Sequence, residues 1–113
     1  MEGMTDKNIR VTDSIFDPNS TEQNVVHYYK GSDGRMHYKV WIFLEGRDTY
    51  EVDYTIYKLH STFSDPIRKV SRTISNPNCG LVIWTWGNFE LGIEIILKTG
   101  EKISASHQMS FDR

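Results

Sequence analysis

The sequence predicts an all-β chain that folds as a sandwich of two antiparallel sheets with about seven or eight strands. Three observations lead to this fold class. Apolar residues recur at every second position along most of the chain, which is the period of a strand with one buried face. Turn-forming residues interrupt the chain about every ten residues, a spacing typical of sandwiches. No window carries the capped apolar stripe of a surface helix.

The strands follow from the apolar side chains between turn residues. The segment 90–98 is the clearest case, because its odd-numbered positions are apolar and their neighbours are mostly polar. A Gly-containing turn joins it to a last strand, so the two predict a hairpin. The run 38–44 is almost continuously apolar and aromatic, which favours a more deeply buried strand. The pattern weakens over 66–74. In chain order, the predicted strands cover residues 9–11, 25–30, 38–44, 50–57, 81–84, 90–98 and 102–111.

Length and composition predict one soluble domain in the cytoplasm. A chain of 113 residues can bury an adequate core, and we expect residues 8–113 to form the domain and residues 1–7 a polar tail. The 13 Lys and Arg against 15 Asp and Glu give a formal charge of −2, which offers no reason to expect nucleic acid or an anionic membrane as a partner. Cys79 is the only cysteine and the first residues do not resemble a signal peptide, which favours a reducing compartment.

Catalytic and metal-binding motifs do not stand out in the sequence. The four histidines are too far apart for a local metal motif, and one cysteine excludes the usual zinc-finger patterns, so we expect no metal and no cofactor. Phosphate-binding loops and nucleophile elbows are also missing. His107 lies on the apolar face of the last predicted strand, where we expect a hydrogen-bonded core histidine. The sequence therefore predicts a binding module rather than an enzyme.

Two segments carry residues that an ordinary sandwich does not need. In LHSTFSDP, residues 59–66, a strand runs into a loop with a histidine, hydroxyl groups and an aromatic ring before a proline that fixes the backbone. In WTWGNF, residues 84–89, three aromatic rings crowd a turn. We expect Trp86 to be exposed and Phe89 to plug the end of the core, while Trp84 fits either environment.

The two segments resemble the signature of the YEATS domain family, which reads approximately Leu-His-x-Ser-Phe followed by Gly-Trp-Gly-x-Phe. This chain has LHSTF at 59–63 and TWGNF at 85–89. The flanking stretches VWIFLEG at 40–46 and FELGIEIILKTGEKI at 89–103 are also similar to the family's strands, so the resemblance covers roughly 36–111. The residues of the two motifs and the short loops of this chain most resemble the prokaryotic branch of the family. Members of that branch often stand beside other domains in bacterial signalling or defence proteins. The resemblance implies an immunoglobulin-like sandwich.

The resemblance also implies a site for an acylated lysine, of crotonyl or acetyl type, at one end of the sandwich. Phe63 and Trp86 would form two walls around the flat amide. Thr62, in place of the family's serine, would bind the amide, and His60 would support the loop. The backbone N–H of Trp86 or Gly87 would meet the acyl carbonyl. Such contacts predict micromolar to millimolar affinity for an acylated lysine peptide or protein, with an adjoining effector domain as a further partner.

Departures from the family pattern concern the edges of this site. Thr85 stands where the family usually has a glycine, which affects the backbone where the ligand chain enters. Met36 and His37 stand where some relatives supply another aromatic ring, and we include Met36 among the expected ligand contacts. If the source is bacterial, three alternatives are open: an acylated protein other than a histone, another small acylated molecule, or a ligand of a different kind altogether.

Other functions fit the same loops. In the first alternative, the exposed rings pack on a neighbouring domain or on a second copy, and the chain is a structural or protein–protein adaptor. In the second, His60 and a nearby hydroxyl form a small hydrolase, but the sequence shows no third group to orient the histidine. Thr62 between His60 and Phe63 favours the reader, because an adaptor has no need of a hydroxyl beside its rings.

Overall fold

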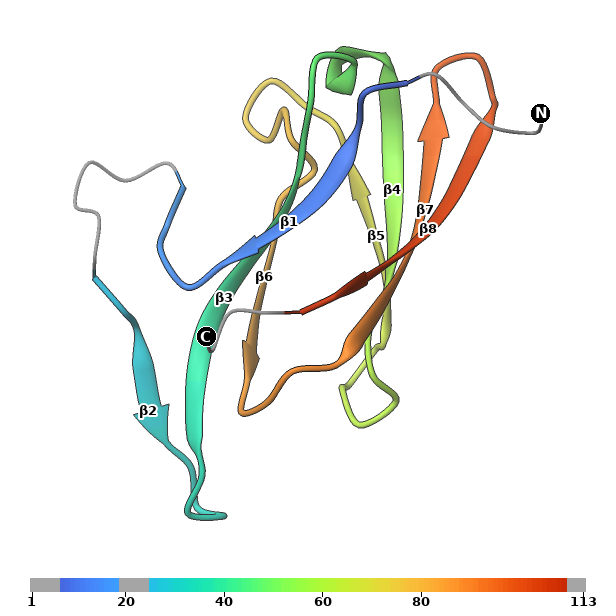
Figure 1. The fold of residues 1–113 in the computed structure, drawn as a ribbon. Helices are drawn as coiled ribbons and strands as arrows, with labels where there is room; N and C mark the ends of the chain where they lie inside the picture. Colours follow the sequence, from blue (N-terminus) through green and yellow to red (C-terminus); the bar gives the residue numbers. More distant parts are fainter. Residues whose placement is uncertain (1–6, 19–24, 110–113) are drawn as a thin grey trace.

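Two antiparallel sheets face each other in the structure, a computed structural model that describes residues 7–18 and 25–109 (Figure 1). The fold is an all-β sandwich of eight strands, as the sequence predicts. Sheet A contains β1 (Arg10–Ser14), β2 (Tyr28–Lys30), β3 (Met36–Glu45) and β6 (Leu81–Thr85). Sheet B contains β5 (Ile67–Ser71), β4 (Val52–Lys58), β7 (Glu90–Leu97) and β8 (Lys102–Gln108) in that order. Within the described residues, no helix is long and apolar enough to cross a membrane.

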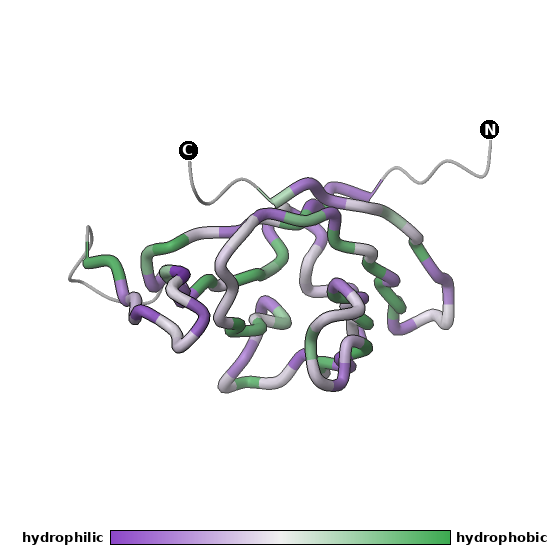
Figure 2. The backbone as a smooth tube through the Cα atoms, turned by 90° about the horizontal axis from the view of Figure 1, so that it is seen from below, coloured by the Kyte–Doolittle hydropathy of each residue, from purple (hydrophilic) through white to green (hydrophobic). Residues whose placement is uncertain are grey.

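β3 is the central strand of sheet A. Its residues 41–45 pair with β1 and its residues 36–38 pair with β2, while residues 38–42 pair with β6. In sheet B, β7 lies between β4 and β8, and the predicted hairpin of the last two strands is confirmed. This arrangement brings the turns β2–β3, β4–β5 and β6–β7 to the same end of the sandwich, at the bottom of Figure 1. Figure 2 looks onto that end.

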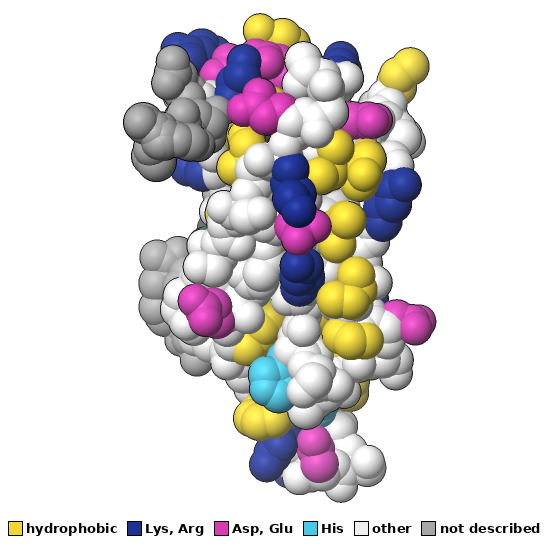
Figure 3. Space-filling view, turned by 90° about the vertical axis from the view of Figure 1, so that its right-hand side faces the viewer, with side chains coloured by type: hydrophobic (Ala, Val, Ile, Leu, Met, Phe, Trp, Pro, Cys, Tyr) yellow, Lys and Arg dark blue, Asp and Glu magenta, His cyan; other side chains and the backbone are white. Residues whose placement is uncertain are grey.

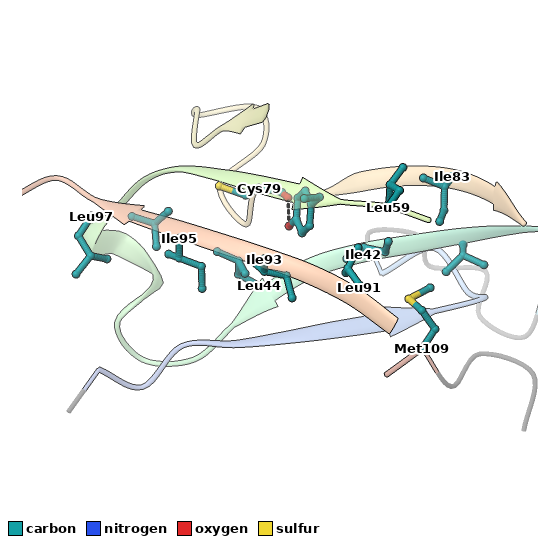
Figure 4. Close-up of a cluster of buried hydrophobic side chains, with 13 residues drawn as sticks. Ile42, Leu44, Leu59, Cys79, Ile83, Leu91, Ile93, Ile95, Leu97 and Met109 are labelled. Carbon is teal, nitrogen blue, oxygen red and sulfur yellow. Dashed lines mark hydrogen bonds between the residues drawn. The ribbon is translucent and has the colours of Figure 1, made fainter. Parts of the chain in front are cut away.

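The core consists of alternate side chains from both sheets (Figure 4). Every second residue of β7 points inward and is buried, which is why its sequence alternates so regularly. Opposite β7, the strands β3 and β6 of sheet A contribute the side chains that point inward, which are every second residue of each strand. Removing this much apolar surface from water is the main favourable term in folding. The fully or nearly fully buried aliphatic residues of these three strands are Val40, Ile42, Leu44, Ile83, Leu91, Ile93, Ile95 and Leu97.

Several strand predictions were wrong in detail. The segment 38–44 is not buried on both faces: Trp41 and Phe43 are only half-buried, because one face of sheet A is directed outward. The predicted strand 50–57 begins only at Val52, since Thr49–Glu51 forms a short 3₁₀ turn. The predicted strand 25–30 is reduced to β2.

Two further differences concern β5 and the chain ends. β5 lies where the pattern weakens, because an edge strand with alternately exposed and half-buried residues leaves little apolar periodicity. The last strand ends at Gln108, and the part of its prediction beyond residue 109 lies outside the described residues. The same is true of residues 1–6 of the predicted tail. Lys7, assigned to that tail, forms an ion pair with Glu51.

The outer face of sheet B carries mixed charges. Lys58 donates to Glu94 at 2.8 Å, and this hydrogen bond lowers the pKa of the Glu94 carboxyl. Lys102 lies 4.0 Å from the same carboxylate. Figure 3 shows charged side chains of both signs along the middle of this side of the molecule, with hydrophobic side chains beside them. Exposed pairs of this kind contribute little to stability.

Two polar contacts join distant parts of the core. His107 Nε2 lies 2.6 Å from Asp13 Oδ1, which links β8 to β1 across the two sheets and confirms that this histidine is hydrogen-bonded. Tyr57 donates its hydroxyl to the backbone carbonyl of Cys79 at 2.6 Å, and both residues are fully buried. Burial raises the pKa of the Tyr57 hydroxyl, so the group stays protonated and keeps its role as donor. Cys79 has a positive φ of 51°, so this bond holds a strained turn before β6.

We predict that Tyr57→Phe destabilises the protein by about 1–3 kcal/mol, because a buried carbonyl loses its partner while the packing of the ring is kept. Chemical denaturation of the two proteins measures the difference. Tyr54→Phe is the matched control, since Tyr54 lies half-buried on β4 with Lys69 over its ring and this contact survives the change. Equal midpoints for the two variants would contradict the role given to the Tyr57 hydroxyl.

Candidate functional site

The turns at one end of the sandwich surround an open groove of about 390 Å³. One part of its wall comes from the β4–β5 loop, a second from the β6–β7 loop and a third from the outer side of β2, β3 and β6. Most ligand pockets have volumes of roughly 300–1,000 Å³, so this groove suits a slender group. The lining residues are Tyr29, His37, His60, Thr62, Phe63, Ser64, Trp84, Thr85, Trp86, Gly87, Asn88 and Phe89.

The β4–β5 loop is held by its own hydrogen bonds. The backbone N–H of Thr62 points to His60 Nδ1 at 3.2 Å, so this ring nitrogen is an acceptor. The Thr62 hydroxyl lies 2.9 Å from the same nitrogen and therefore donates to it. Its lone pairs remain available on a side chain that is exposed to solvent. Farther along the loop, Arg68 donates to the carbonyl oxygens of Ser64 and Asp65 and fixes the return into β5.

The β6–β7 loop is shaped by Thr85, which is buried at the end of β6. Its hydroxyl donates to the Gly87 carbonyl at 2.8 Å and accepts from the Gly87 N–H at 3.4 Å. Thr85 thus takes part in the turn itself, a common role for a hydroxyl residue in a loop. A Cβ at Gly87 would meet nothing within 4 Å, so the fold does not require a glycine here and the space beside it is open.

The aromatic residues of the two loops have different surroundings. Phe63 packs on Phe89 with ring centroids 5.4 Å apart, and both rings lie against the core. His60 meets the edge of Phe89 at 6.4 Å. Trp86 is 53% exposed, as expected, and the guanidinium of Arg35 lies 3.9 Å from the centre of its ring. Phe63 and Trp86 line the same groove but, within the described part of the chain, make no ring contact with each other.

The third wall was not predicted from the sequence. Tyr29 on β2 stacks on His37 of β3 with centroids 4.8 Å apart and planes 7° apart. Tyr29 also packs on Trp84 at 5.2 Å. Trp84 is 42% exposed and does not plug the core, because Ile83 and Thr85 take the inward positions of β6. The pairing of β2 and β6 with β3 creates this wall, and only the sheet order could have revealed it.

The strand register also explains why one predicted site residue, Met36, lies outside the groove. Met36 does not line the groove. Met36 and His37 are neighbours at the start of β3, and successive side chains of a strand point to opposite faces. His37 therefore reaches the groove, while Met36 stands opposite Lys30 in the β2–β3 ladder. Gly31 leaves room for the imidazole, because a Cβ there would lie 2.7 Å from His37 Nε2.

The described residues contain no group of three or more His, Cys, Asp or Glu side chains arranged to hold a metal ion. His60 is hydrogen-bonded to Thr62, and within residues 7–18 and 25–109 it has no carboxylate partner to orient it as a base. The groove instead offers rings, hydroxyl groups, the Asn88 amide and backbone groups. This combination can hold a flat, uncharged polar group.

The comparison with family models decides the identity of the fold. The model of the prokaryotic YEATS domain matches residues 36–110, about two thirds of the chain. The chain belongs to the prokaryotic YEATS domain family. A comparison with curated proteins found no match.

Solved YEATS domain structures share this fold. The crystal structure of the yeast AF-9 homolog protein Yaf9 matches with a TM-score of 0.63 and 18% sequence identity, over 93% of this chain and 67% of that chain. The Yaf9 YEATS domain bound to H3K27ac matches with a TM-score of 0.56 and 16% identity, over 93% and 69%. The Yaf9 YEATS domain recognising an H3K122suc peptide matches with a TM-score of 0.55 and 15% identity, over 93% and 70%. The sandwich is therefore immunoglobulin-like, as expected.

Most of the residues that the YEATS resemblance singled out lie together. Six of the seven line the groove, and Met36 is the exception. Thr85 contributes mainly by shaping the loop, since its hydroxyl is bonded to Gly87. Whether the six bind a ligand stays a prediction. Those that line the groove are His60, Thr62, Phe63, Thr85, Trp86 and Gly87.

We predict that Trp86→Ala leaves the unfolding free energy of the YEATS domain within about 0.5 kcal/mol of the parent, because the indole is exposed and lies outside the core. Phe89→Ala is the comparison variant. It removes a ring packed against the core and against Phe63, and we expect it to cost at least about 2 kcal/mol. Thermal and urea unfolding measure both. A large loss of stability in Trp86→Ala would show that the indole is a structural residue.

Proposed function

We propose that this YEATS domain is a non-catalytic recognition module that holds an acylated lysine side chain in the groove between Phe63 and Trp86. The observation that carries the proposal is the pair of rings that line one open groove without stacking on each other. A planar acyl amide can enter such a space and cover an aromatic face on each side. Each stacked contact contributes on the order of 0.5–1.5 kcal/mol beyond the burial of area.

Thr62 supplies the acceptor for the amide N–H of the ligand. Its hydroxyl proton is directed to His60 Nδ1, which leaves the oxygen lone pairs for an incoming donor. His60 acts as a positioning residue, because it fixes the rotation of the hydroxyl through two contacts with the same residue. The backbone of the loop then need not move when the ligand binds.

The acyl carbonyl needs a donor on the opposite side of the groove. The N–H of Gly87 already points to Thr85 Oγ1, although the bond is long at 3.4 Å. We therefore assign the carbonyl to the N–H of Trp86. The open space at Gly87 gives the acyl chain room to pass. With two neutral hydrogen bonds of about 1 kcal/mol each and two ring faces, the expected affinity is micromolar to millimolar.

Crotonyl-lysine is the acyl form that we expect to bind best, because its conjugated chain is flat over its whole length and stacks on both rings. The related Yaf9 domain is bound to H3K27ac in one structure and recognises an H3K122suc peptide in another. For this chain, we propose an acylated lysine on a protein as the partner. Cys79 is buried and unpaired, which fits a reducing cytoplasm.

The proposal predicts that a crotonyl-lysine peptide shifts the NMR signals of the groove residues, that an acetyl-lysine peptide does so more weakly, and that unmodified lysine does not. Trp86→Ala should lower the affinity at least about tenfold, because one stacking face is removed. Isothermal or fluorescence titration gives the affinities. If no acylated peptide binds while the domain associates with itself or with a neighbouring domain through these rings, the adaptor function applies instead.

Removal of the Thr62 hydroxyl should weaken crotonyl-lysine binding about tenfold, since the ligand amide N–H would be buried without an acceptor. Thr62→Val keeps the shape of the side chain and deletes only the hydroxyl. Thr62→Ser keeps the hydroxyl and should bind within about twofold of the parent. If Val and Ser variants bind equally well, Thr62 does not contact the amide.

A further inference from the structure

The β2–β3 hairpin is a basic element beside the groove. Over residues 28–39 it carries three cations, Lys30, Arg35 and Lys39, and one carboxylate, Asp33. The chain as a whole has a formal charge of −2, so this hairpin differs in sign from the rest of the molecule. Charge of one sign that gathers at the edge of a binding groove attracts groups of the opposite sign.

Two of these cations lie next to the groove, one over a groove ring and the other opposite a groove residue in the strand ladder. The Arg35 guanidinium lies 3.9 Å from the centre of the Trp86 ring. Lys39 stands opposite Trp84 in the β3–β6 ladder, and its Nζ lies 5.2 Å from the centre of the Trp41 ring. Neither cation is a lining residue of the groove itself. Because Arg35 lies over the lining ring of Trp86 and Lys39 stands opposite the lining residue Trp84, both border the groove.

These cations lack the ion pairs that other cations of the fold have. Lys58, Lys102 and Arg10 each lie within 4.0 Å of a carboxylate. Within the described part of the chain, Arg35 and Lys39 have no carboxylate partner.

The acid of the hairpin is directed elsewhere. Asp33 accepts a hydrogen bond from the Arg35 backbone N–H and lies 3.5 Å from His37 Nε2, contacts that are internal to the hairpin. The backbone hydrogen bond lowers the pKa of its carboxyl, so it stays ionised at neutral pH. It reduces the local charge and attracts Arg35 at longer range, but among the described residues it forms no ion pair with the head group of Arg35 or Lys39.

We propose that the outer face of sheet A beside the groove, bordered by Arg35 and Lys39, binds an acidic stretch of the polypeptide that carries the acylated lysine. The inference rests on the proposed function and specifies its partner. The acyl group lies among the lining residues, whereas the backbone of the ligand leaves the groove next to Trp84 and Trp86. Aspartate or glutamate within a few residues of the modified lysine meets the two unpaired cations there. The surface is continuous with the groove, because Tyr29 and Trp84 belong to both.

The test compares three peptides that carry the same crotonyl-lysine and differ only in the flanking residues, which are glutamate, alanine or lysine. A fourth ligand, N-acetyl-crotonyl-lysine methylamide, has no flanks. We expect the acidic peptide to bind roughly tenfold more tightly than the basic one at low salt, with alanine between them. The difference should shrink as the ionic strength rises, because the charges are exposed.

Charge reversal locates the effect on sheet A. Lys39→Glu should abolish or invert the preference for acidic flanks and leave the affinity for the flankless ligand unchanged. Lys98→Glu makes the same change of net charge at the β7–β8 turn, at the opposite end of the sandwich from the groove (Figure 1), and should keep the preference. Lys39→Gln, which only removes the charge, should reduce the preference by about half on a logarithmic scale.

Each outcome decides the matter. Equal affinities for the three peptides, or an unchanged preference in Lys39→Glu, would overturn the acidic partner while the flankless ligand still binds and the proposed function stands. A flankless ligand that does not bind at all, together with crotonylated peptides that bind no better than their unmodified forms, would remove the proposed function and this inference with it.

Discussion

The groove depends on the alternation of side chains in β3 and β6. Burial of Val40, Ile42 and Ile83 fixes which face of these strands is turned inward. A slip of one residue would move every side chain of a strand to the other face, so the core holds the register firmly. Because Ile83 and Thr85 point inward, Trp84 must point outward, and the same rule directs His37 toward the groove and Met36 away from it. The position of the aromatic wall is thus a consequence of core packing.

The loops that complete the groove are held by local polar contacts as well as by the packing of Phe63 and Phe89 against the core. His60 with Thr62 and Thr85 with Gly87 form short-range bonds within single loops. Such contacts order a few residues in the absence of a ligand, which would lower the entropic cost of the proposed binding. They also explain how Trp86 can be exposed and still hold its position. The hydrogen bonds between the Thr85 hydroxyl and Gly87 fix the turn around Trp86, and Arg35 lies over one face of its ring.

The sequence predicts this fold well where strands have one buried face and poorly where they do not. β7 is evident because its inward residues are all large and apolar, whereas β5 is an edge strand whose residues never become fully buried. The two loop motifs could be placed at one end of the sandwich through the family resemblance, and six of the seven predicted contact residues meet there. Tyr29 could not be found in this way, because its role arises from pairing between β2 and β3, and the register across a turn is not visible in composition or periodicity.

The groove end of the sandwich exposes large aromatic rings and carries cations beside them. Tyr29, Trp84 and Trp86 expose large ring surfaces to water, which is unfavourable and invites non-specific association. Arg35 reduces this cost at Trp86, because a cation above a ring shields its face while keeping the surface charged, and Lys39 lies in the same way over Trp41 of β3. In the proposed complex, the same two cations would also select among ligands. A basic segment would be repelled by the hairpin, whereas an acidic segment would pair with the cations without displacing them, so the contact that shields Trp86 would also favour an acidic partner.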